Sequence, residues 1–183
     1  MKITPMEIEG VYLIEPIVHQ DSRGFFMESY NEQIFIEKGL HYKFIQDNHA
    51  LSREAGVIRG LHYQLAPKAQ TKLIRATAGA IYDVVVDIRE GSDTFGKWIG
   101  VILSEENKRQ LLIPKGFAHG YCTLTTNTQV IYKVDEFYSP EHDRGIAWND
   151  INLSIDWPVS NPILSDKDKN HPELVNAEIN FKI

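Results

Sequence analysis

The sequence predicts an all-β fold, an antiparallel sandwich or barrel with few helices. From Phe44 onward, short runs rich in Val, Ile, Tyr and Thr follow one another, and Gly, Pro, Asn or Asp separates most of them. The gaps are also too short for the helices that a parallel βαβ arrangement needs. The expected strands are residues 44–46, 57–64, 71–77, 80–88, 97–103, 111–113, 118–123 and 128–137.

The two ends of the chain carry different signals. Residues 11–18 (VYLIEPIV) predict a strand with Pro16 near an edge, and the turn signal 21–24 (DSRG) precedes a strand at 25–29. Residues 31–39 predict a short helix, because Asn31 can cap its start and Gly39 suits the position after its end. The last ~30 residues mix prolines with charges, which predicts an irregular tail over the barrel.

Length and composition indicate an ordinary globular protein. The chain has 183 residues, 43% hydrophobic and 24% charged, which favours a single domain over 1–183 with a core barrel at about 44–150. The net charge of −6 disfavours nucleic acid and anionic membranes as partners. No segment approaches the ~20 apolar residues of a membrane span, and acidic residues interrupt the N-terminal stretch, so no signal peptide is expected.

The chain contains one cysteine, Cys122, so an intrachain disulfide is impossible. A cytoplasmic location is therefore expected. Cys122 lies in an apolar run at 120–124, which favours a buried, inert thiol over a nucleophile.

The most informative stretch for chemistry is 57–63, VIRGLHY, in which Arg59 and His62 flank Gly60. A cation beside a proton acceptor suits an anionic substrate and a proton transfer. On a regular strand, residues three apart face opposite sides, so both can face one cavity only if the strand bulges. Gly60 permits such a bulge. A histidine in a strand is otherwise more often a hydrogen-bonded core residue.

Lys72, Tyr132 and Tyr138 each allow two interpretations. Lys72 lies in an apolar strand, where it is either a solvated outer residue or an inward charge that can stabilise an oxyanion. Tyrosines in strands are normally packing residues with a hydrated hydroxyl group. Facing a cavity, one tyrosine can instead donate its phenol proton, and a second can stack on a nucleobase.

Two acidic residues, Asp83 and Asp87, interrupt the apolar run at 82–88. Outward solvation is the expected state of both. The alternative is that one of them is a partner of His62.

Residues 113–120 (IPKGFAHG) resemble the second sequence motif of cupins, a superfamily of small β-barrels. In metal-binding cupins the histidine of this motif is a ligand, together with an H-x-H pair in the first motif. The corresponding stretch here, 60–64, reads GLHYQ and has no H-x-H. His62 and His119 alone are a poor ligand set, so the barrel is supported and no metal is expected.

Several ordered segments together resemble the dTDP-4-dehydrorhamnose 3,5-epimerase family, from about residue 3 to about residue 174. They are 21–28 (DSRGFFME), 44–48 (FIQDN), 56–64 (GVIRGLHYQ), 95–98 (FGKW), 112–119 (LIPKGFAH), 138–140 (YSP), 145–150 (GIAWND) and 164–168 (LSDKD). The resemblance implies a cupin-type jelly roll with one or a few short helices. It also implies a homodimer without metal or organic cofactor, which inverts C3 and C5 of dTDP-4-dehydro-6-deoxy-D-glucose to give dTDP-4-dehydro-L-rhamnose.

The resemblance also assigns catalytic roles. His62 is the base, Asp168 orients it, Lys72 stabilises the enolate oxygen, and Tyr132 delivers a proton from the opposite face. Asp166 lies two residues from Asp168 and is the alternative partner of His62. Both reacting carbons lie next to the C4 ketone, so removal of either proton gives an enolate, which explains why no cofactor is needed.

The family's substrate-binding residues match a second set in this sequence. Arg59 and His119 are expected around the diphosphate and sugar, and Tyr138 is expected to stack on thymine. Arg23 and Glu28 match residues that the family lends to the neighbouring subunit's site. The remaining matches are Gln46, Asp47, Asn48, Asp143 and Lys167.

Three other functions are compatible with parts of the sequence. The first is an epimerase of a deoxysugar antibiotic pathway that inverts only C3 or C5, and the complete match to the rhamnose pattern disfavours it. The second is a sugar-nucleotide-binding cupin without catalysis, which the joint presence of His62, Lys72 and Tyr132 disfavours. The third is a metal-dependent cupin oxygenase.

Overall fold

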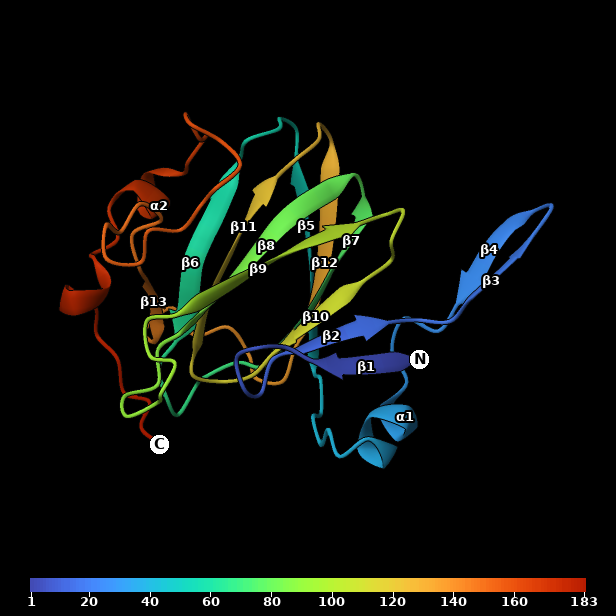
Figure 1. Ribbon diagram of the computed structural model, residues 1–183, viewed down its shortest axis with the longest axis horizontal. Helices are drawn as coiled ribbons and strands as arrows, with labels where there is room; N and C mark the ends of the chain where they lie inside the picture. Colours follow the sequence, from blue (N-terminus) through green and yellow to red (C-terminus); the bar gives the residue numbers. More distant parts are fainter.

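Two antiparallel sheets pack face to face in the computed structural model, which describes residues 1–183 (Figure 1). The first sheet has the order β1 (Lys2–Pro5), β2 (Tyr12–Glu15), β10 (Gln110–Ile113), β7 (Lys72–Ala78), β12 (Thr128–Val134) and β5 (Gln46–Ser52). The second has the order β13 (Asp143–Gly145), β6 (Ile58–Gln64), β11 (Phe117–Thr123), β8 (Ala80–Asp87) and β9 (Trp98–Ser104). The expected all-β jelly roll is confirmed.

The five-stranded sheet is buried on both of its faces. Side chains alternate along β8, so that Ile81 and Val85 pack into the core between the sheets. Val84 and Val86 point the other way and contact the C-terminal tail. Cys122 also lies in this outer core, and burial raises the pKa of its thiol to about 11, as expected of an inert cysteine.

The C-terminal tail is irregular, as expected, and covers the outer face of the five-stranded sheet (Figure 1). Leu153 and Trp157 are buried in that contact. The tail also contains the short helix α2 (Asp166–Lys169) and the 3₁₀ turn η1 (Leu174–Asn176), and α2 lies beside β6. The tail therefore brings α2 to the edge of the barrel.

The predicted N-terminal helix is present as α1 (Glu32–Glu37). The side chain of Asn31 accepts hydrogen bonds from the backbone N–H groups of Gln33 and Ile34, at 3.1 and 3.3 Å. Gly39 follows the helix with φ +79°, as the sequence predicted.

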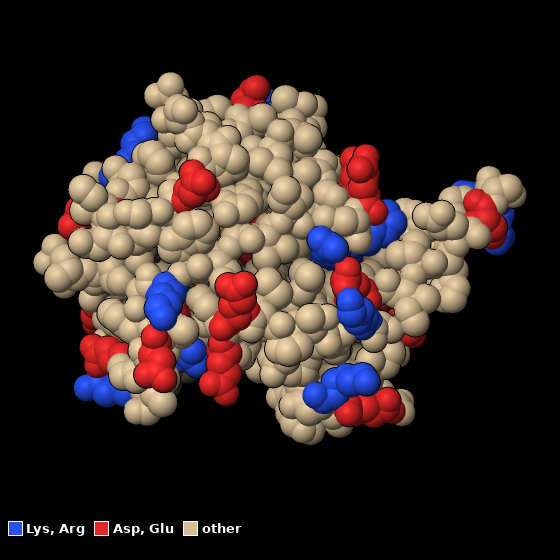
Figure 2. Space-filling model, viewed as in Figure 1, with Lys and Arg blue, Asp and Glu red and all other residues tan.

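The single strand expected at 11–18 is wrong, because the chain divides there into β2 and β3 (Val18–Asp21). Pro16 lies at the break and has no N–H to donate to a sheet. β3 pairs with β4 (Gly24–Met27) in a hairpin that projects from the barrel (Figure 1). Acidic and basic atoms gather at its tip (Figure 2).

Some predicted boundaries also need correction. The strand expected at 44–46 starts at Gln46 and continues to Ser52, and the one expected at 128–137 ends at Val134. β1 and β13 were not predicted, and β1 and β2 extend the six-stranded sheet to residues before 44. None of the helices is long and apolar enough to cross a membrane.

Candidate active site

A cavity of about 400 Å³ opens between the two sheets and beneath the tail. Its charged and polar lining includes Arg59, His62, Lys72, His119, Tyr132 and Asp168. A smaller adjoining hollow of about 200 Å³ shares His62, Lys72 and Tyr132 and adds Tyr138 and Asp143. Residues that the sequence singled out in distant segments therefore lie around one space.

A β-bulge at Gly60 directs two of these side chains into the cavity. Arg59 pairs with Tyr121 and His62 pairs with His119, so three steps along β6 match two steps along β11. The extra residue offsets the alternation that would otherwise separate Arg59 from His62. The predicted bulge is confirmed.

The bulge requires glycine. Gly60 has φ +135°, and a Cβ there would lie 2.5 Å from Gly120 Cα and 2.9 Å from the carbonyl oxygen of His119. Ile58 and Leu61, on either side of this position, pack into the outer core. The apolar residues of β6 thus anchor the strand while its polar residues face the cavity.

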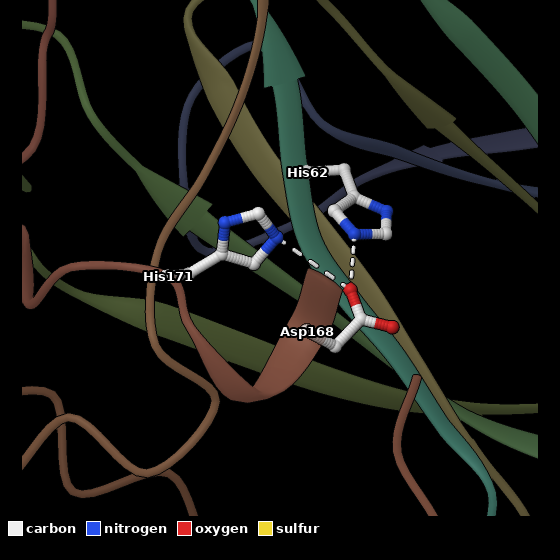
Figure 3. A group of neighbouring side chains, drawn as sticks. All are labelled: His62, Asp168 and His171. Carbon is white, nitrogen blue, oxygen red and sulfur yellow. Dashed lines mark hydrogen bonds and ion pairs between the residues drawn. The ribbon is translucent and has the colours of Figure 1, made fainter. Parts of the chain in front are cut away.

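His62 forms a pair with Asp168, as expected, with Nε2 2.5 Å from Oδ1 (Figure 3). Ser165 caps α2 by accepting from the backbone N–H of Asp168, and its Oγ donates to Asp168 Oδ2 at 2.8 Å. Burial opposes ionisation of Asp168, but the hydrogen bonds from His62 and Ser165 outweigh it and hold the pKa of the carboxyl below its ordinary value. Asp168 is therefore ionised and can only accept, so Nε2 of His62 carries the proton of this hydrogen bond.

The choice between the two aspartates follows from their positions. Asp166 is 96% exposed and pairs with Lys169 at 3.0 Å, whereas the Asp168 side chain is 5% exposed. His171 also approaches the pair. Its Nε2 lies 3.6 Å from Asp168 Oδ1, and its ring meets that of His62 edge-on at 5.4 Å between centroids (Figure 3).

Lys72 and Tyr132 come from the opposite sheet, on β7 and β12, so the inward interpretation holds for both. Lys72 Nζ donates to the carbonyl oxygen of His62 at 3.3 Å. Removal from bulk water lowers the pKa of Lys72 to about 8, against the attraction of Asp143 and Asp83. Burial raises the pKa of the Tyr132 phenol, which keeps its proton in place.

A second histidine–carboxylate pair lies deeper, with His119 Nε2 2.9 Å from Asp83 Oδ2. The expectation that Asp83 and Asp87 face solvent is wrong, because both are fully buried. No hydrogen bond joins either aspartate to His62, whose partner is Asp168. Asp83 has the parity of Ile81 and Val85 and faces inward, and Asp87 accepts two hydrogen bonds from the Arg89 guanidinium.

The rim of the cavity carries several of the expected nucleotide-binding residues. The Tyr138 hydroxyl donates to Asp143 Oδ2 at 2.9 Å, and Lys167 forms an ion pair with the same carboxylate. Gln46 Oε1 accepts from the backbone N–H of Tyr138 at 3.3 Å, while its Nε2 donates to Asn48 at 2.9 Å. These contacts join β5, β13 and the tail into one polar edge.

Three expected binding residues do not reach this cavity. Asp47 alternates to the outer face of β5, where it is 63% exposed and pairs with Lys133 at 2.9 Å, and its role in nucleotide binding stays a prediction. Arg23 lies on the projecting hairpin and pairs with Asp21. Glu28 accepts from Asn31 at 3.1 Å beyond the hairpin. A role for Arg23 and Glu28 in a neighbouring subunit stays a prediction.

Sequence reasoning missed three residues of the site: Asp83 as the partner of His119, Ser165 and His171. Asp83 had no signal in the parity of its strand, because residues of both parities in 81–88 are apolar. Ser165 had a usable signal, because S-x-x-D is the pattern of a helix N-cap. His171 had none beyond its spacing of three from Asp168.

Comparison with known proteins agrees with this geometry. The sequence model of the family described as dTDP-4-dehydrorhamnose 3,5-epimerase matches residues 5–176. A relative of that name from Shigella flexneri is 54% identical over 179 residues, which cover 97% of this chain and 98% of the relative.

Two solved structures extend the comparison. The enzyme of the same name from Bacillus anthracis, with TDP and PPi bound, has a TM-score of 0.92 and 56% identity over 94% of this chain and 98% of its own. A dTDP-6-deoxy-D-glucose-3,5-epimerase from Legionella pneumophila, in complex with dTDP-4-keto-L-rhamnose, has a TM-score of 0.91 and 45% identity over 96% and 93%.

Proposed function

The chain belongs to the dTDP-4-dehydrorhamnose 3,5-epimerase family and is an isomerase, and from this we propose the substrate and the mechanism. The substrate is dTDP-4-dehydro-6-deoxy-D-glucose, and inversion at C3 and C5 gives dTDP-4-dehydro-L-rhamnose. The observation that carries the mechanism is the placement of His62 and Tyr132 on facing sheets of one cavity. Inversion requires a base on one face of a carbon and an acid on the other.

His62 removes the proton. Its Nδ1 accepts the proton from C3 or C5, and the electrons of the broken C–H bond move toward the C4 oxygen to form an enolate. Asp168 stabilises the imidazolium through Nε2, where it already accepts a hydrogen bond. Lys72 stabilises the enolate oxygen as a fixed cation in a site withdrawn from water.

Tyr132 completes the inversion. The enolate electrons return to form a new C–H bond with the Tyr132 phenol proton, on the face opposite His62. The tyrosinate then regains a proton from solvent and His62 releases one. The same exchange at the second carbon gives the doubly inverted product.

The nucleotide is held at the polar edge of the cavity. Arg59 and His119 bind the diphosphate and the sugar, and guanidinium groups suit phosphate oxygens. Tyr138, which is 56% exposed on the rim, stacks on thymine.

We further infer a homodimer in which the projecting hairpin carries Arg23 and Glu28 to the neighbouring subunit. The exposed Phe25 and Phe26 on that hairpin support it, because aromatic side chains exposed together are typical of interfaces. The cytoplasm is the location expected for such an enzyme.

The test of the base is solvent deuterium uptake at C3 and C5 of the ketosugar, followed by NMR. His62→Asn should abolish uptake at both carbons. His49→Asn is the matched control, because His49 is an exposed histidine on the outer face of β5, bonded to Gln129. Uptake by His62→Asn at the rate of the control would refute the assignment. Label at one carbon only in the wild-type product would indicate a single epimerisation.

The acid is tested by Tyr132→Phe, which should retain exchange but form little inverted product. Tyr42→Phe is the control, because Tyr42 packs against Phe44 outside the cavity. Product formation by Tyr132→Phe at the control rate would remove Tyr132 from the mechanism.

A further inference from the structure

His171 is a buried histidine beside the proposed base, and the mechanism above does not use it. Its side chain is 10% exposed, and its Nε2 is buried without a hydrogen-bond partner. Asp168 Oδ1 lies 3.6 Å away, beyond a hydrogen bond. An unpaired polar atom in the interior is unfavourable, so a group that it binds is worth seeking.

The position of His171 is built into the fold. Its ring lies over Gly145 of β13, where any Cβ would overlap the ring atoms. Gly145 pairs with His62 across β13 and β6, so the glycine holds the second imidazole beside the first. Asp168, three residues before His171, lies between the two rings (Figure 3).

The three side chains together form a donor set for a transition metal. One ring nitrogen of His62, one of His171 and an oxygen of Asp168 all lie within 4.8 Å of one another. Two imidazoles and one carboxylate suit Zn²⁺, whereas Mg²⁺ prefers oxygen ligands and keeps its water. We propose that His62, Asp168 and His171 bind Zn²⁺, and that the bound ion switches the epimerase off.

The spacing needs one small adjustment. Tetrahedral Zn²⁺ with bonds of about 2.1 Å sets its ligand atoms about 3.4 Å apart. His171 Nε2 and Asp168 Oδ1 are already 3.6 Å apart, while His62 Nε2 and Asp168 Oδ1 are 2.5 Å apart. The carboxylate must therefore move about 1 Å from His62 as the ion replaces the proton between them. His62 is 31% exposed toward the cavity, which gives the ion a path to enter.

The proposed inhibition by Zn²⁺ follows from the two nitrogens of the His62 ring. A neutral imidazole bound to metal through Nε2 carries its proton on Nδ1. Nδ1 is the atom that accepts the substrate proton in the proposed mechanism, so metal-bound His62 cannot act as the base. This part of the inference rests on the proposed function, but metal binding itself does not.

Binding is tested on chelator-treated protein without substrate, by equilibrium dialysis or calorimetry with Zn²⁺ alone. Wild type and His49→Asn should each bind one tight Zn²⁺ per chain. Loss of an outer partner of a ligand costs about 10–100-fold in metal affinity, so His171→Asn, which removes a ligand, should cost at least about 100-fold. Equal affinity in His171→Asn, or no tight site in wild type, would overturn the proposal.

Inhibition is tested separately by solvent exchange at C3 and C5, with each protein normalised to its own rate without metal. Zn²⁺ should stop exchange in wild type, a chelator should restore it, and Mg²⁺ should have no effect. His171→Asn should be resistant to Zn²⁺. Binding that leaves exchange intact would overturn the switch. If the wild type acts on no ketosugar, the binding experiment still decides the site.

A measurement on the wild type alone covers the case in which His171→Asn fails to fold. Co²⁺ in a four-coordinate site of nitrogen and oxygen ligands absorbs strongly in the visible range, and its spectrum reports the geometry. Such a spectrum, displaced by one equivalent of Zn²⁺, supports the site. The weak spectrum of fully hydrated Co²⁺ would count against it.

Discussion

Replacement of Gly60 by alanine tests the physical basis of the site, because two separate costs meet at this residue. Gly60 has φ +135°, where a side chain costs about 1–3 kcal/mol in backbone strain. The new Cβ would also lie 2.5 Å from Gly120 Cα and 2.9 Å from the carbonyl oxygen of His119, which are backbone atoms of the paired strand. Such overpacking costs about 1–3 kcal/mol. Gly60→Ala should therefore lose about 2–6 kcal/mol of unfolding free energy.

Gly24 provides a matched control. It has φ +131°, and nothing lies within 4 Å of the Cβ that alanine would add. Gly24→Ala therefore carries the strain without the overlap and should lose only about 1–3 kcal/mol. Chemical denaturation of both variants at one fixed protein concentration gives the two losses, and their difference measures the overlap between β6 and β11.

Equal losses of unfolding free energy in the two glycine variants would refute the reasoning, because the overlap of the new Cβ with β11 would then cost nothing. The same substitution has a second consequence for the site. The bulge directs Arg59 and His62 into one cavity, so any Gly60→Ala protein that folds should have lost most of its epimerase activity.

Three further predictions concern titrating groups. Asp168→Asn should lower kcat about 10²–10⁴-fold, because an amide can donate to His62 Nε2 and so place the imidazole proton on Nδ1. Asp166→Asn should act like wild type in the same exchange assay. The pKa of Lys72 is lowered to about 8, and the proposed mechanism needs its charged form, so kcat should fall as pH rises through about 8. Lys72→Arg should move this alkaline limb of the pH–kcat profile to higher pH, because arginine stays charged. An alkaline limb that does not move would exclude Lys72 as its source. Burial opposes ionisation of Asp87, but hydrogen bonds from Arg89 and nearby hydroxyls lower its pKa to about 2. Its stabilisation is complete above about pH 4 and lost as pH falls toward 2, so Asp87→Asn should flatten acid unfolding followed by circular dichroism; an equally steep curve would contradict this.

Local features were predictable where one residue type meets one backbone requirement. Asn31 caps α1 because its short side chain reaches the free N–H groups of the first turn. Gly60 marks the bulge because only glycine tolerates both its φ and its neighbours. The strand and helix signals needed no knowledge of distant residues, so composition and spacing were sufficient.

Errors arose where the sequence does not say how many faces of a strand are covered. Asp83 and Asp87 were expected in solvent because charged residues in strands are usually exposed. Asp83 instead faces the core between the sheets with Ile81 and Val85, and the tail covers the opposite face of β8, so neither face of that strand reaches water. Asp47 was expected at the nucleotide site because residues 46–48 match a polar segment of the family, whereas alternation along β5 turns its side chain outward to Lys133.

The pair of His62 and Asp168 lay beyond local reasoning for a different cause. The two residues are 106 positions apart, and no periodic signal connects them. Only the resemblance to a family placed Asp168 beside His62, and it could not distinguish Asp168 from Asp166 by chemistry. The fold makes that distinction, because the cap at Ser165 turns one aspartate inward and leaves the other exposed.

The arrangement of layers explains why a jelly roll suits a double inversion. Tyr132 and Lys72, the acid and the cation of the proposed mechanism, lie on the six-stranded sheet, and the proposed base His62 lies on the five-stranded sheet. In that mechanism, opposite faces of a sugar held between the sheets meet opposite groups. The carboxylate that bonds Nε2 of His62 belongs to Asp168 and comes from a third layer, the tail. Lys72 donates a hydrogen bond to the backbone carbonyl of His62 and so connects the two sheets. In the proposed mechanism the negative charge of the enolate develops beside this lysine. Reprotonation from the same face would only regenerate the substrate, so in the proposed mechanism the separation of His62 from Tyr132 across the cavity makes inversion the outcome.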